Sequence, residues 1–392
     1  MSKMTIGIDQ LGFYTPNYYV DLVDLAQARG VDPDKFTIGI GQDKQAVPPS
    51  SQDVVTMGAS AANEFLTPDM KQDIGLIVLG TETGIDASKA GSLYIQQLLN
   101  LNPWSRAIEI KEACYGATAG LMLAKDYIAT HPGKTALVIA SDIARYGLET
   151  GGEVTQGAGA IAMLVTENPR IMALGDVSSY YSEQVMDFWR PVYTDEAIAL
   201  GKYSTEQYIR FFELTWADYQ KQTGKQLADF AAMTFHLPYT KMGLKALRTA
   251  LPEADAVKQA DLLAKYEESI QYSRQVGNIY TGSLYLGLLS LLEKNTNLQA
   301  GDEIGLFSYG SGAVGEFFTA TLVDGFRSQL HAEQHQATLD ARTQLSVPDY
   351  ELVFKDKVPY AADNYQADPA RFAGDFVLSG VTDQQRQYQV NE

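Results

Sequence analysis

Short apolar runs alternate with amphipathic segments through the first 168 residues of the chain. Nearly continuous apolar runs bounded by polar residues are typical of buried strands, whereas apolar residues three or four positions apart indicate helices. These patterns predict strands at residues 4–9, 74–80, 135–142 and 157–165, and helices at residues 19–29, at residues 52–66 and after residue 116. The alternation predicts an α/β fold with a mostly parallel sheet and helices on its faces.

The second half of the chain resumes this pattern after a segment of different composition. Residues 169–230 are rich in aromatic and charged side chains, and we expect an insertion and helices that wall a pocket. A strand is expected at residues 231–236, an apolar helix at 284–292 and a strand at 303–308. The similar order of elements suggests an internal duplication, although no literal repeat is visible. Beyond about residue 339 the periodicity fades, and no element is assigned there.

Composition narrows the class of protein. The 392 residues suffice for two domains or one large double domain. There are 30 basic and 48 acidic residues, and the net charge of −18 argues against non-specific binding to nucleic acid or anionic membranes. No apolar run reaches the roughly 18 residues that span a bilayer. The start of the chain lacks the apolar block of a signal peptide, so a cytoplasmic location is expected.

The single cysteine, Cys114, is expected at a turn from a strand into a helix. The free N–H groups and the positive dipole end of that helix favour thiolate over thiol. Its small neighbours Ala113 and Gly116 leave room for a substrate. The alternative is a buried structural thiol, because free cysteine is among the most buried residue types. One cysteine cannot form an internal disulfide or a zinc site of several thiolates.

Glu82 and His236 lie at the ends of expected strands, and Asn278 lies just before an expected helix. Glu82 directly follows an apolar strand, where sheets of this type place ligands, although a solvated loop acid is the alternative. His236 also ends a strand, and it gains a catalytic interpretation only beside Cys114, because lone histidines are more often structural. Asn278 precedes a helix and offers an amide donor that can orient a carbonyl.

Two further motifs resemble ligand sites. His331 and His335 lie one helical turn apart, but no third metal ligand is evident and a solvated helix face is expected. Residues 310–315 spell G-x-G-x-x-G after a strand, but no acidic residue follows at the spacing of a dinucleotide site. We interpret these glycines as a close approach of the backbone to a ligand or to Cys114.

A stripe of basic residues follows His236. Lys241, Lys245 and Arg248 fall on one face of an expected helix. Charged stripes usually face water, so an ordinary solvated face is the simpler interpretation. Beside a thiol nucleophile, the same stripe suggests a grip on a phosphorylated carrier such as coenzyme A.

Taken together, Glu82, Cys114, His236 and Asn278 resemble the active-site set of condensing enzymes of the thiolase superfamily. More closely, the chain is similar over nearly its whole length to the bacterial 3-hydroxy-3-methylglutaryl-CoA synthases of the mevalonate pathway. The related ketoacyl synthases III share the cysteine, histidine and asparagine but lack the glutamate, so Glu82 distinguishes the two. The blocks that carry the resemblance are residues 39–42, 80–82, 112–118, 141–144, 155–160, 187–191, 235–241, 277–283 and 308–312.

The resemblance implies a thiolase-like fold with two duplicated halves in a layered αβαβα arrangement. Residues 1–168 would form the N-terminal half with Glu82 and Cys114, and residues 169–392 the C-terminal half with His236 and Asn278. It also implies a homodimer. Coenzyme A thioesters would be substrates, with no metal and no further cofactor.

The implied activity is that of an acyltransferase that forms a C–C bond. It would condense acetyl-CoA with acetoacetyl-CoA and water to give 3-hydroxy-3-methylglutaryl-CoA (HMG-CoA) and CoA. Cys114 would take the acetyl group as a thioester. Glu82 would remove a methyl proton as general base, and His236 would hydrogen-bond and protonate the acetoacetyl oxygen.

The resemblance also implies residues that contact the substrates. After residues 187–191, some relatives carry a loop with proline and glycine, whereas residues 192–198 of this chain read VYTDEAI. This difference affects the expected wall of the pocket and the role assigned to Ser204. The implied contacts to substrate or CoA are Asp32, Thr155, Ser204, Lys245, Asn278 and Ser311, with Lys241 from the basic stripe and with Tyr146 and Asp187 near the acyl site.

Two other functions are weighed against this one. A ketoacyl synthase III-like enzyme, or another Cys-His acyltransferase or thioesterase that makes no such C–C bond, would not need Glu82. A non-catalytic acyl-CoA-binding or scaffold protein would need none of the three residues Cys114, Glu82 and His236.

Overall fold

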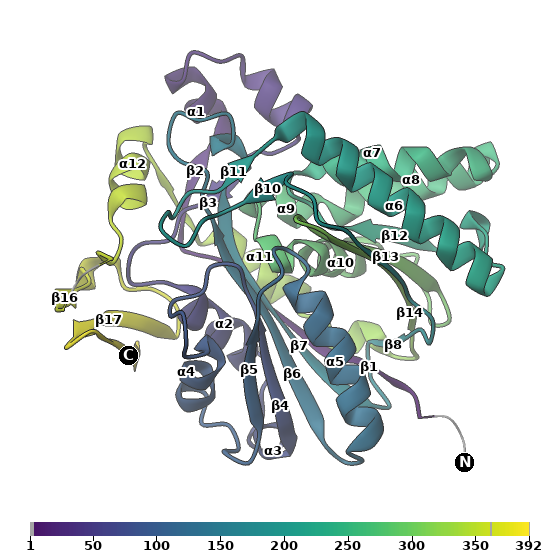
Figure 1. Ribbon diagram of the computed structural model, residues 1–392, viewed down its shortest axis with the longest axis horizontal. Helices are drawn as coiled ribbons and strands as arrows, with labels where there is room; N and C mark the ends of the chain where they lie inside the picture. The colour runs from purple at the N-terminus through teal and green to yellow at the C-terminus, as the bar shows by residue number, and fades with distance from the viewer. Residues whose placement is uncertain (1–3, 361–362, 392) are drawn as a thin grey trace.

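A computed structural model of the chain describes residues 4–360 and 363–391 (Figure 1). Its centre is a ten-stranded sheet in the order β12-β13-β14-β8-β1-β7-β6-β4-β5, with β9 also paired to β14. The strands are β1 (Ile6–Tyr14), β4 (Ile74–Gly80), β5 (Arg106–Ile110), β6 (Thr135–Ala144), β7 (Gly157–Glu167), β8 (Met172–Leu174), β9 (Ser179–Ser182), β12 (Ala232–Phe235), β13 (Glu303–Gly310) and β14 (Val314–Leu322). Strands from both halves of the chain therefore lie in one sheet.

The sheet is mixed, so the prediction of a mostly parallel sheet is wrong. β4 is parallel to β5 and β6, and β12 is parallel to β13. In contrast, β7 is antiparallel to β1 and β6, and β13 is antiparallel to β14. Parallel neighbours need a long crossover connection. Residues 311–313 and 145–156 are connections without an α-helix, and they return the chain antiparallel.

Helices cover both faces of the sheet (Figure 1). A Cβ atom built on Gly58 would lie 2.9 Å from Ile139, and one built on Gly120 would lie 3.3 Å from Val138. Val138 and Ile139 are adjacent in β6, so their side chains point to opposite faces. The α2 helix, with Gly58, and the α5 helix, with Gly120, therefore pack on opposite faces. The helices are α1 (Leu22–Ala28), α2 (Val54–Asn63), α3 (Pro68–Asp73), α4 (Gly91–Leu98), α5 (Gly116–Thr130), α6 (Gly201–Thr223), α7 (Thr240–Ala250), α8 (Ala256–Ser269), α9 (Gln271–Val276), α10 (Ser283–Lys294), α11 (Ala332–Asp340) and α12 (Val347–Lys355).

The aromatic segment at residues 169–230 forms core more than pocket wall. The α6 helix buries its aromatic face against Phe235, Phe307 and Phe317 of the sheet. The predicted pocket wall is therefore wrong for these side chains, whose rings pack edge to face inside the protein. The buried α6 residues are Tyr208, Phe211, Phe212, Thr215, Trp216 and Tyr219.

Short strands and single turns complete the fold. The tail, which the sequence left unassigned, forms α12, a strand beside β2 and a small sheet packed near α2. The remaining strands are β2 (Tyr18–Asp21), β3 (Lys44–Ala46), β10 (Phe188–Trp189), β11 (Ile198–Ala199), β15 (Thr343–Leu345), β16 (Tyr365–Gln366), β17 (Phe376–Thr382) and β18 (Gln385–Val390). The single turns are η1 (Lys35–Ile40), η2 (Glu153–Thr155), η3 (Leu227–Asp229), η4 (Leu251–Glu253), η5 (Tyr280–Gly282), η6 (Phe326–Gln329) and η7 (Pro369–Arg371).

The predicted strands and helices are confirmed apart from their ends. The helix expected at residues 19–29 starts later, because Tyr18–Asp21 pairs as a strand and the Asp21 side chain caps α1. The α/β class is confirmed, whereas the division of the chain at residue 168 stays a prediction. Among the described residues, no helix is long and apolar enough to cross a bilayer.

Candidate active site

Cys114 lies in the tight turn between β5 and α5. Ala113 adopts a positive φ of 41°, and the helix starts two residues after the cysteine. At the end of the neighbouring strand β4, a Cβ atom on Gly80 would lie 2.5 Å from the Ala117 nitrogen. Glycine at this position therefore lets the start of α5 approach the end of β4. The predicted turn from strand to helix is confirmed.

Glu82 faces the cysteine across this junction. The Cys114 thiol donates a hydrogen bond to Glu82 Oε1, with 3.1 Å between Sγ and Oε1. Both side chains are buried, at 9 % and 7 % exposure. The structure therefore brings together two residues that are 32 positions apart in the chain.

Asp142 fixes the position of the Glu82 backbone. Its Oδ1 accepts the Glu82 N–H at 2.9 Å and the Thr81 and Thr83 hydroxyls at 2.8 Å each. Its Oδ2 accepts the Thr281 N–H at 3.1 Å and hydroxyl at 2.5 Å. Asp142 is fully buried at the end of β6. Sequence analysis gave it no role, although an acid within an apolar strand was the available signal.

Burial dominates the electrostatics of the thiol and the carboxyl. Burial, followed by the charge of Asp142, raises the pKa of Glu82 to about 8, against the opposing charge of Arg190. Burial and the Glu82 carboxylate raise the pKa of Cys114 well above its usual value. The prediction that the helix dipole favours a thiolate is therefore wrong for the free enzyme. The low-dielectric site and the neighbouring carboxylate outweigh the dipole.

His236 follows β12 directly, at the predicted strand end. Its backbone N–H donates to the Phe307 carbonyl at 2.8 Å, and its carbonyl accepts the Tyr208 hydroxyl at 2.7 Å. The side chain is 2 % exposed, and burial lowers its pKa to about 3. The imidazole is therefore neutral at working pH.

The β13–β14 turn closes over Cys114. A Cβ atom on Gly310 would lie 2.5 Å from the Glu112 carbonyl oxygen and 2.6 Å from the Tyr115 Cβ. This confirms the interpretation of the G-x-G-x-x-G residues as a close backbone approach to the cysteine turn. The pattern sits in a hairpin and not at the start of a helix, so it has no dinucleotide geometry.

Asn278 and Tyr280 present two buried polar groups beside the cysteine. The Asn278 Oδ1 accepts the Tyr280 N–H at 2.8 Å and the Ser283 hydroxyl at 2.9 Å. The Asn278 Nδ2 and the Tyr280 hydroxyl are buried without a hydrogen-bond partner of good geometry among the described residues. Tyr280 packs in one cluster with Cys114 and Ala144. Both groups act on the Tyr146 side chain, so these three polar groups converge in one buried place.

Aromatic rings surround Cys114. Tyr146 and Phe188 pack against the cluster around Cys114. The Tyr146 ring centroid lies 6.1 Å from that of Phe188 and 6.2 Å from that of Tyr280. This placement agrees with the acyl-site role implied for Tyr146. It also adds Phe188 and Tyr280, which were not among the predicted site residues.

Asp187 anchors the segment that carries Phe188. Its carboxylate accepts the Tyr309 hydroxyl at 2.9 Å, the Gly312 N–H at 3.0 Å and the Ser204 hydroxyl at 3.2 Å. Asp187 is fully buried. Residues 190–197 connect β10 to β11 as a hairpin, in which Val192 and Tyr193 are exposed.

The other predicted contact residues are half-buried or exposed, and their hydrogen bonds within the described part of the chain are with residues other than Cys114 and Glu82. Asp32 is exposed at the start of η1, whereas Thr155 and Ser311 are half-buried. Lys241 is half-buried, and its stem passes close to Gly41. Lys245 is exposed, and its Nζ donates to the Tyr239 hydroxyl at 3.0 Å.

The histidine pair differs from its prediction. His335 is fully buried, not on a solvated face. Its Nε2 lies 2.8 Å from Glu64 Oε1, and its Nδ1 lies 2.8 Å from Glu293 Oε1. Burial opposes charge, but the two carboxylates outweigh it and raise the pKa of His335 to about 9. Both ring nitrogens are occupied, so His335 is not a metal ligand.

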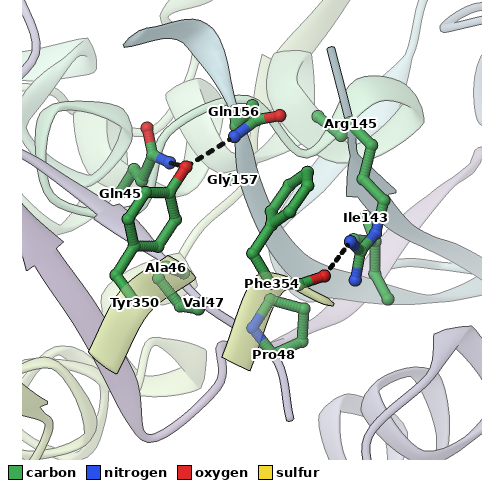
Figure 2. A pocket seen from close by; sticks show the side chains of 11 residues that line it. Gln45, Ala46, Val47, Pro48, Ile143, Arg145, Gln156, Gly157, Tyr350 and Phe354 are labelled. Atoms are coloured by element: carbon green, nitrogen blue, oxygen red, sulfur yellow. Dashed lines mark hydrogen bonds between the residues drawn. The ribbon is translucent and has the colours of Figure 1, made fainter. Parts of the chain in front are cut away.

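A small pocket is lined by residues 45–48, 143–145, 156–157, Tyr350 and Phe354 (Figure 2). Gln156 Oε1 accepts the Tyr146 N–H at 2.8 Å, and Gln156 Nε2 donates to the Tyr350 hydroxyl at 2.9 Å. On the other side, Arg145 donates to the Phe354 carbonyl at 2.8 Å (Figure 2). The C-terminal helix α12 thus supports the wall of the acyl site from behind.

Comparisons with known proteins agree over almost the whole chain. Residues 2–170 match the family model described as hydroxymethylglutaryl-coenzyme A synthase N terminal, and residues 253–390 match the corresponding C-terminal model. The chain is 51 % identical to the hydroxymethylglutaryl-CoA synthase of Enterococcus faecalis, over 98 % of this chain and 100 % of that protein.

Solved structures give the same result. A crystal structure of HMG-CoA synthase complexed with CoA superposes with a TM-score of 0.97 at 47 % identity, covering 99 % of this chain and 100 % of that one. A structure of MvaS in complex with 3-hydroxy-3-methylglutaryl coenzyme A has a TM-score of 0.88 at 36 % identity, with 100 % of both chains covered.

Proposed function

The chain belongs to the hydroxymethylglutaryl-CoA synthase family, and we propose that Cys114, Glu82 and His236 perform its reaction. It is an acyltransferase with a thiolase-like fold that condenses acetyl-CoA with acetoacetyl-CoA and water to give HMG-CoA and CoA, a step of the mevalonate pathway. One observation carries the assignment of the residues: the buried thiol of Cys114 lies 3.1 Å from Glu82 Oε1.

Acetylation starts from a neutral thiol. Glu82 Oε1 already accepts the Cys114 S–H, so it takes this proton as the sulfur attacks the thioester carbonyl. The C–S bond of acetyl-CoA then breaks, and the leaving sulfur takes the proton from Glu82. Acetyl-Cys114, free CoA and an ionised Glu82 result.

Condensation uses the same carboxylate as a base. Glu82 removes a methyl proton from acetyl-Cys114, and the enolate attacks C3 of acetoacetyl-CoA. The new alkoxide accepts a hydrogen bond from the His236 N–H and takes the proton from Glu82. We assign the proton to Glu82 because burial leaves the imidazole neutral, and a neutral imidazole is a far weaker acid than a carboxyl with a pKa of about 8.

Hydrolysis returns the enzyme to its starting state. Glu82 accepts a proton from a water molecule as its oxygen attacks the thioester carbonyl at Cys114. The C–S bond breaks, and the sulfur takes the proton from Glu82 as it leaves. The new carboxyl group of the product loses its proton to solvent and departs as a carboxylate. The hydrogen bond between Cys114 and the ionised Glu82 then forms again.

The outer contacts remain proposals on the same scheme. Tyr146 and Asn278 suit the acyl end of the substrates, because the Tyr146 ring packs against the Cys114 cluster and the Asn278 side chain acts on Tyr146. Asp187 and Ser204 hold the wall of that pocket. Contacts to the CoA portion are proposed for Asp32, Thr155, Lys241, Lys245 and Ser311.

We propose a homodimer that pairs through β5. This strand ends the sheet, so one edge of its backbone has no strand partner among the described residues. Ile108 of β5 and Leu123 of α5 are 38 % and 48 % exposed. An open edge with exposed apolar residues favours pairing with a second copy. Light scattering should give a dimer mass for the wild type and a monomer mass for Ile108→Lys.

The cytoplasm stays the proposed compartment. Cys114 is the single cysteine and acts as a free thiol in the proposed mechanism. A reducing compartment keeps such a thiol from oxidation.

A labelling experiment tests the proposed function. Acetyl-CoA with carbon-13 in both acetyl carbons is mixed with unlabelled acetoacetyl-CoA. The products are separated, and the label is located by mass spectrometry with fragmentation. The proposal predicts HMG-CoA labelled in the free carboxyl carbon and the adjacent methylene. Cys114→Ser should make none. A Cys-His thioesterase would release labelled acetate without the six-carbon product, and that result would overturn the proposal.

A further inference from the structure

The proposed hydrolysis creates an anion in an already acidic site. The product carboxylate appears at Cys114, whose sulfur lies 3.1 Å from Glu82 Oε1. Burial raises the pKa of Cys114 most, and the negative charges of Glu82, Asp142 and Asp187 raise it further. In a low-dielectric pocket, like charges at this separation repel strongly. A compensating cation is therefore needed near Cys114.

Arg190 is placed to supply that charge. It follows β10 by one residue and lies two positions after Phe188, whose ring packs against the Cys114 cluster. In an extended segment, residues two apart point to the same side. The charge of Arg190 acts on both Glu82 and Tyr280, where it opposes the rise in pKa that burial produces.

The guanidinium of Arg190 is free to take a ligand. Across residues 4–360 and 363–391 its side chain forms no hydrogen bond and no ion pair. The pKa of Asp195 is lowered mainly by Lys357, which pairs with its carboxylate, and to a lesser extent by the charge of Arg190. A half-buried guanidinium that the protein leaves unpaired offers the planar pair of donors that suits a carboxylate.

Tyr280 supplies a second, independent group. Its side chain is 0 % exposed, its φ is +43°, and its hydroxyl meets the Tyr146 side chain without a hydrogen bond of good geometry among the described residues. A buried hydroxyl that is poorly hydrogen-bonded costs free energy. A strained backbone at such a position is typical of a functional site. The Tyr280 ring contacts Phe188 at 5.9 Å between centroids, so it shares the wall that leads to Arg190.

We propose that Arg190 and Tyr280 form a carboxylate subsite that receives the free carboxylate of the six-carbon product as it leaves Cys114. The inference deepens the proposed function and rests on it. The subsite holds the carboxylate of the hydrolysis product away from Glu82. Glu82 can then accept the hydrogen bond of the Cys114 thiol again. The same pair discriminates a carboxylate from a neutral group of the same shape.

Binding of two matched ligands tests the subsite. HMG-CoA and its carboxamide analogue, which differ only in the charge at the free carboxyl, are titrated calorimetrically into wild type, Arg190→Gln and Tyr280→Phe at pH 7. Wild type should prefer the carboxylate. Arg190→Gln should weaken HMG-CoA binding by roughly 10- to 100-fold and leave the carboxamide within about twofold, as expected for losing a charge-assisted hydrogen-bonded pair. Tyr280→Phe should show a smaller loss of the same selectivity.

Two controls keep the outcome interpretable. Lys202→Gln removes one positive charge from an exposed position on α6 and should leave the selectivity unchanged. Arg190→Lys keeps the charge but not the planar donors and should recover part of it. If Arg190→Gln weakens both ligands equally, or neither, the subsite is refuted. Acetylation of Cys114 by acetyl-CoA, followed by intact mass in the same variant, reports separately on the proposed function.

Discussion

The Cys114 thiol and the Glu82 carboxylate lie 3.1 Å apart in a buried site. Burial and the carboxylate raise the pKa of the thiol, whereas the hydrogen bond from the thiol opposes the rise in the pKa of Glu82 that burial produces. In the protein without substrate, the thiol is therefore neutral and donates a hydrogen bond to Glu82, its proposed base. In the proposed mechanism Glu82 both accepts the thiol proton and later removes a methyl proton, so one carboxylate links acetylation, condensation and hydrolysis. The activity of the enzyme should then follow the ionisation of Glu82.

The pH profile should show this ionisation. Glu82 acts as a base only when ionised, and its pKa is raised to about 8, so kcat/KM should rise with pH and level off above about pH 8. Burial lowers the pKa of His236 to about 3, so no second inflection is expected between pH 5 and 7. Steady-state rates from pH 5 to 10 provide the check. A limb centred near pH 6.5 would instead indicate a titrating histidine.

Asp142→Asn should act on Glu82 without touching substrate. The neutral side chain keeps its shape but loses the charge that helps to raise the pKa of Glu82. We expect the inflection of the pH profile to move to lower pH and the condensation rate to fall by about 100-fold, because a misplaced base is costly. Thr81→Val, which removes one hydrogen bond to Asp142 and no charge, should leave the inflection in place.

Lys241→Ala with Lys245→Ala tests the basic stripe. If these side chains hold the phosphates of CoA, KM for both thioester substrates should rise by roughly three- to tenfold, the range for exposed ion pairs, with a smaller fall in kcat. Acetyl-pantetheine, which lacks those phosphates, serves as the control and should show no change in KM. Unchanged KM values for the CoA substrates would mean that the stripe is an ordinary solvated face.

The buried His335 makes stability depend on pH. Its pKa is raised from 6.5 to about 9 in the folded protein, so its contribution is complete below about pH 6.5 and is lost as pH rises through 9. The shift corresponds to at most about 3 kcal/mol.

Denaturant unfolding of wild type and His335→Gln at pH 6 and pH 9.5 measures this contribution. The variant should be less stable at pH 6, because Glu64 and Glu293 then lose their cationic partner. The difference between the two proteins should shrink at pH 9.5. A difference that does not change with pH would contradict the assigned charge. Comparing the two proteins cancels the titration of Glu82, which they share.

The sequence pattern indicated two of the proposed catalytic residues because they follow apolar strands directly. Glu82 follows β4 and His236 follows β12, and such runs are recognisable without any structure. Cys114 stood out as the only cysteine, between a short strand and a helix. Their proximity was inferred from the family resemblance, and the structure brings Cys114 and Glu82 into direct contact.

Other properties depend on partners that are remote in the chain. Asp142 binds groups from the ends of β4 and from η5, and those contacts span 61 and 139 positions. His335 binds Glu293 at a distance of 42 positions. The raised pKa of Cys114 follows from burial, which the local pattern of residues 108–121 does not encode. The antiparallel pairing of β6 with β7 depends on the connection at residues 145–156, which contains no α-helix. The composition of these residues did not indicate this.

The most direct test of the central claim is the intact mass of the protein after mixing with acetyl-CoA and then with acetoacetyl-CoA, for wild type and Glu82→Gln. Wild type should gain one acetyl group and then lose it to HMG-CoA. Glu82→Gln should gain the acetyl group more slowly and keep it, with condensation reduced by about 10²–10⁴-fold, the usual contribution of a positioned base. If Glu82→Gln discharges its acetyl group into HMG-CoA at the wild-type rate, Glu82 is not the base and the proposed mechanism is wrong.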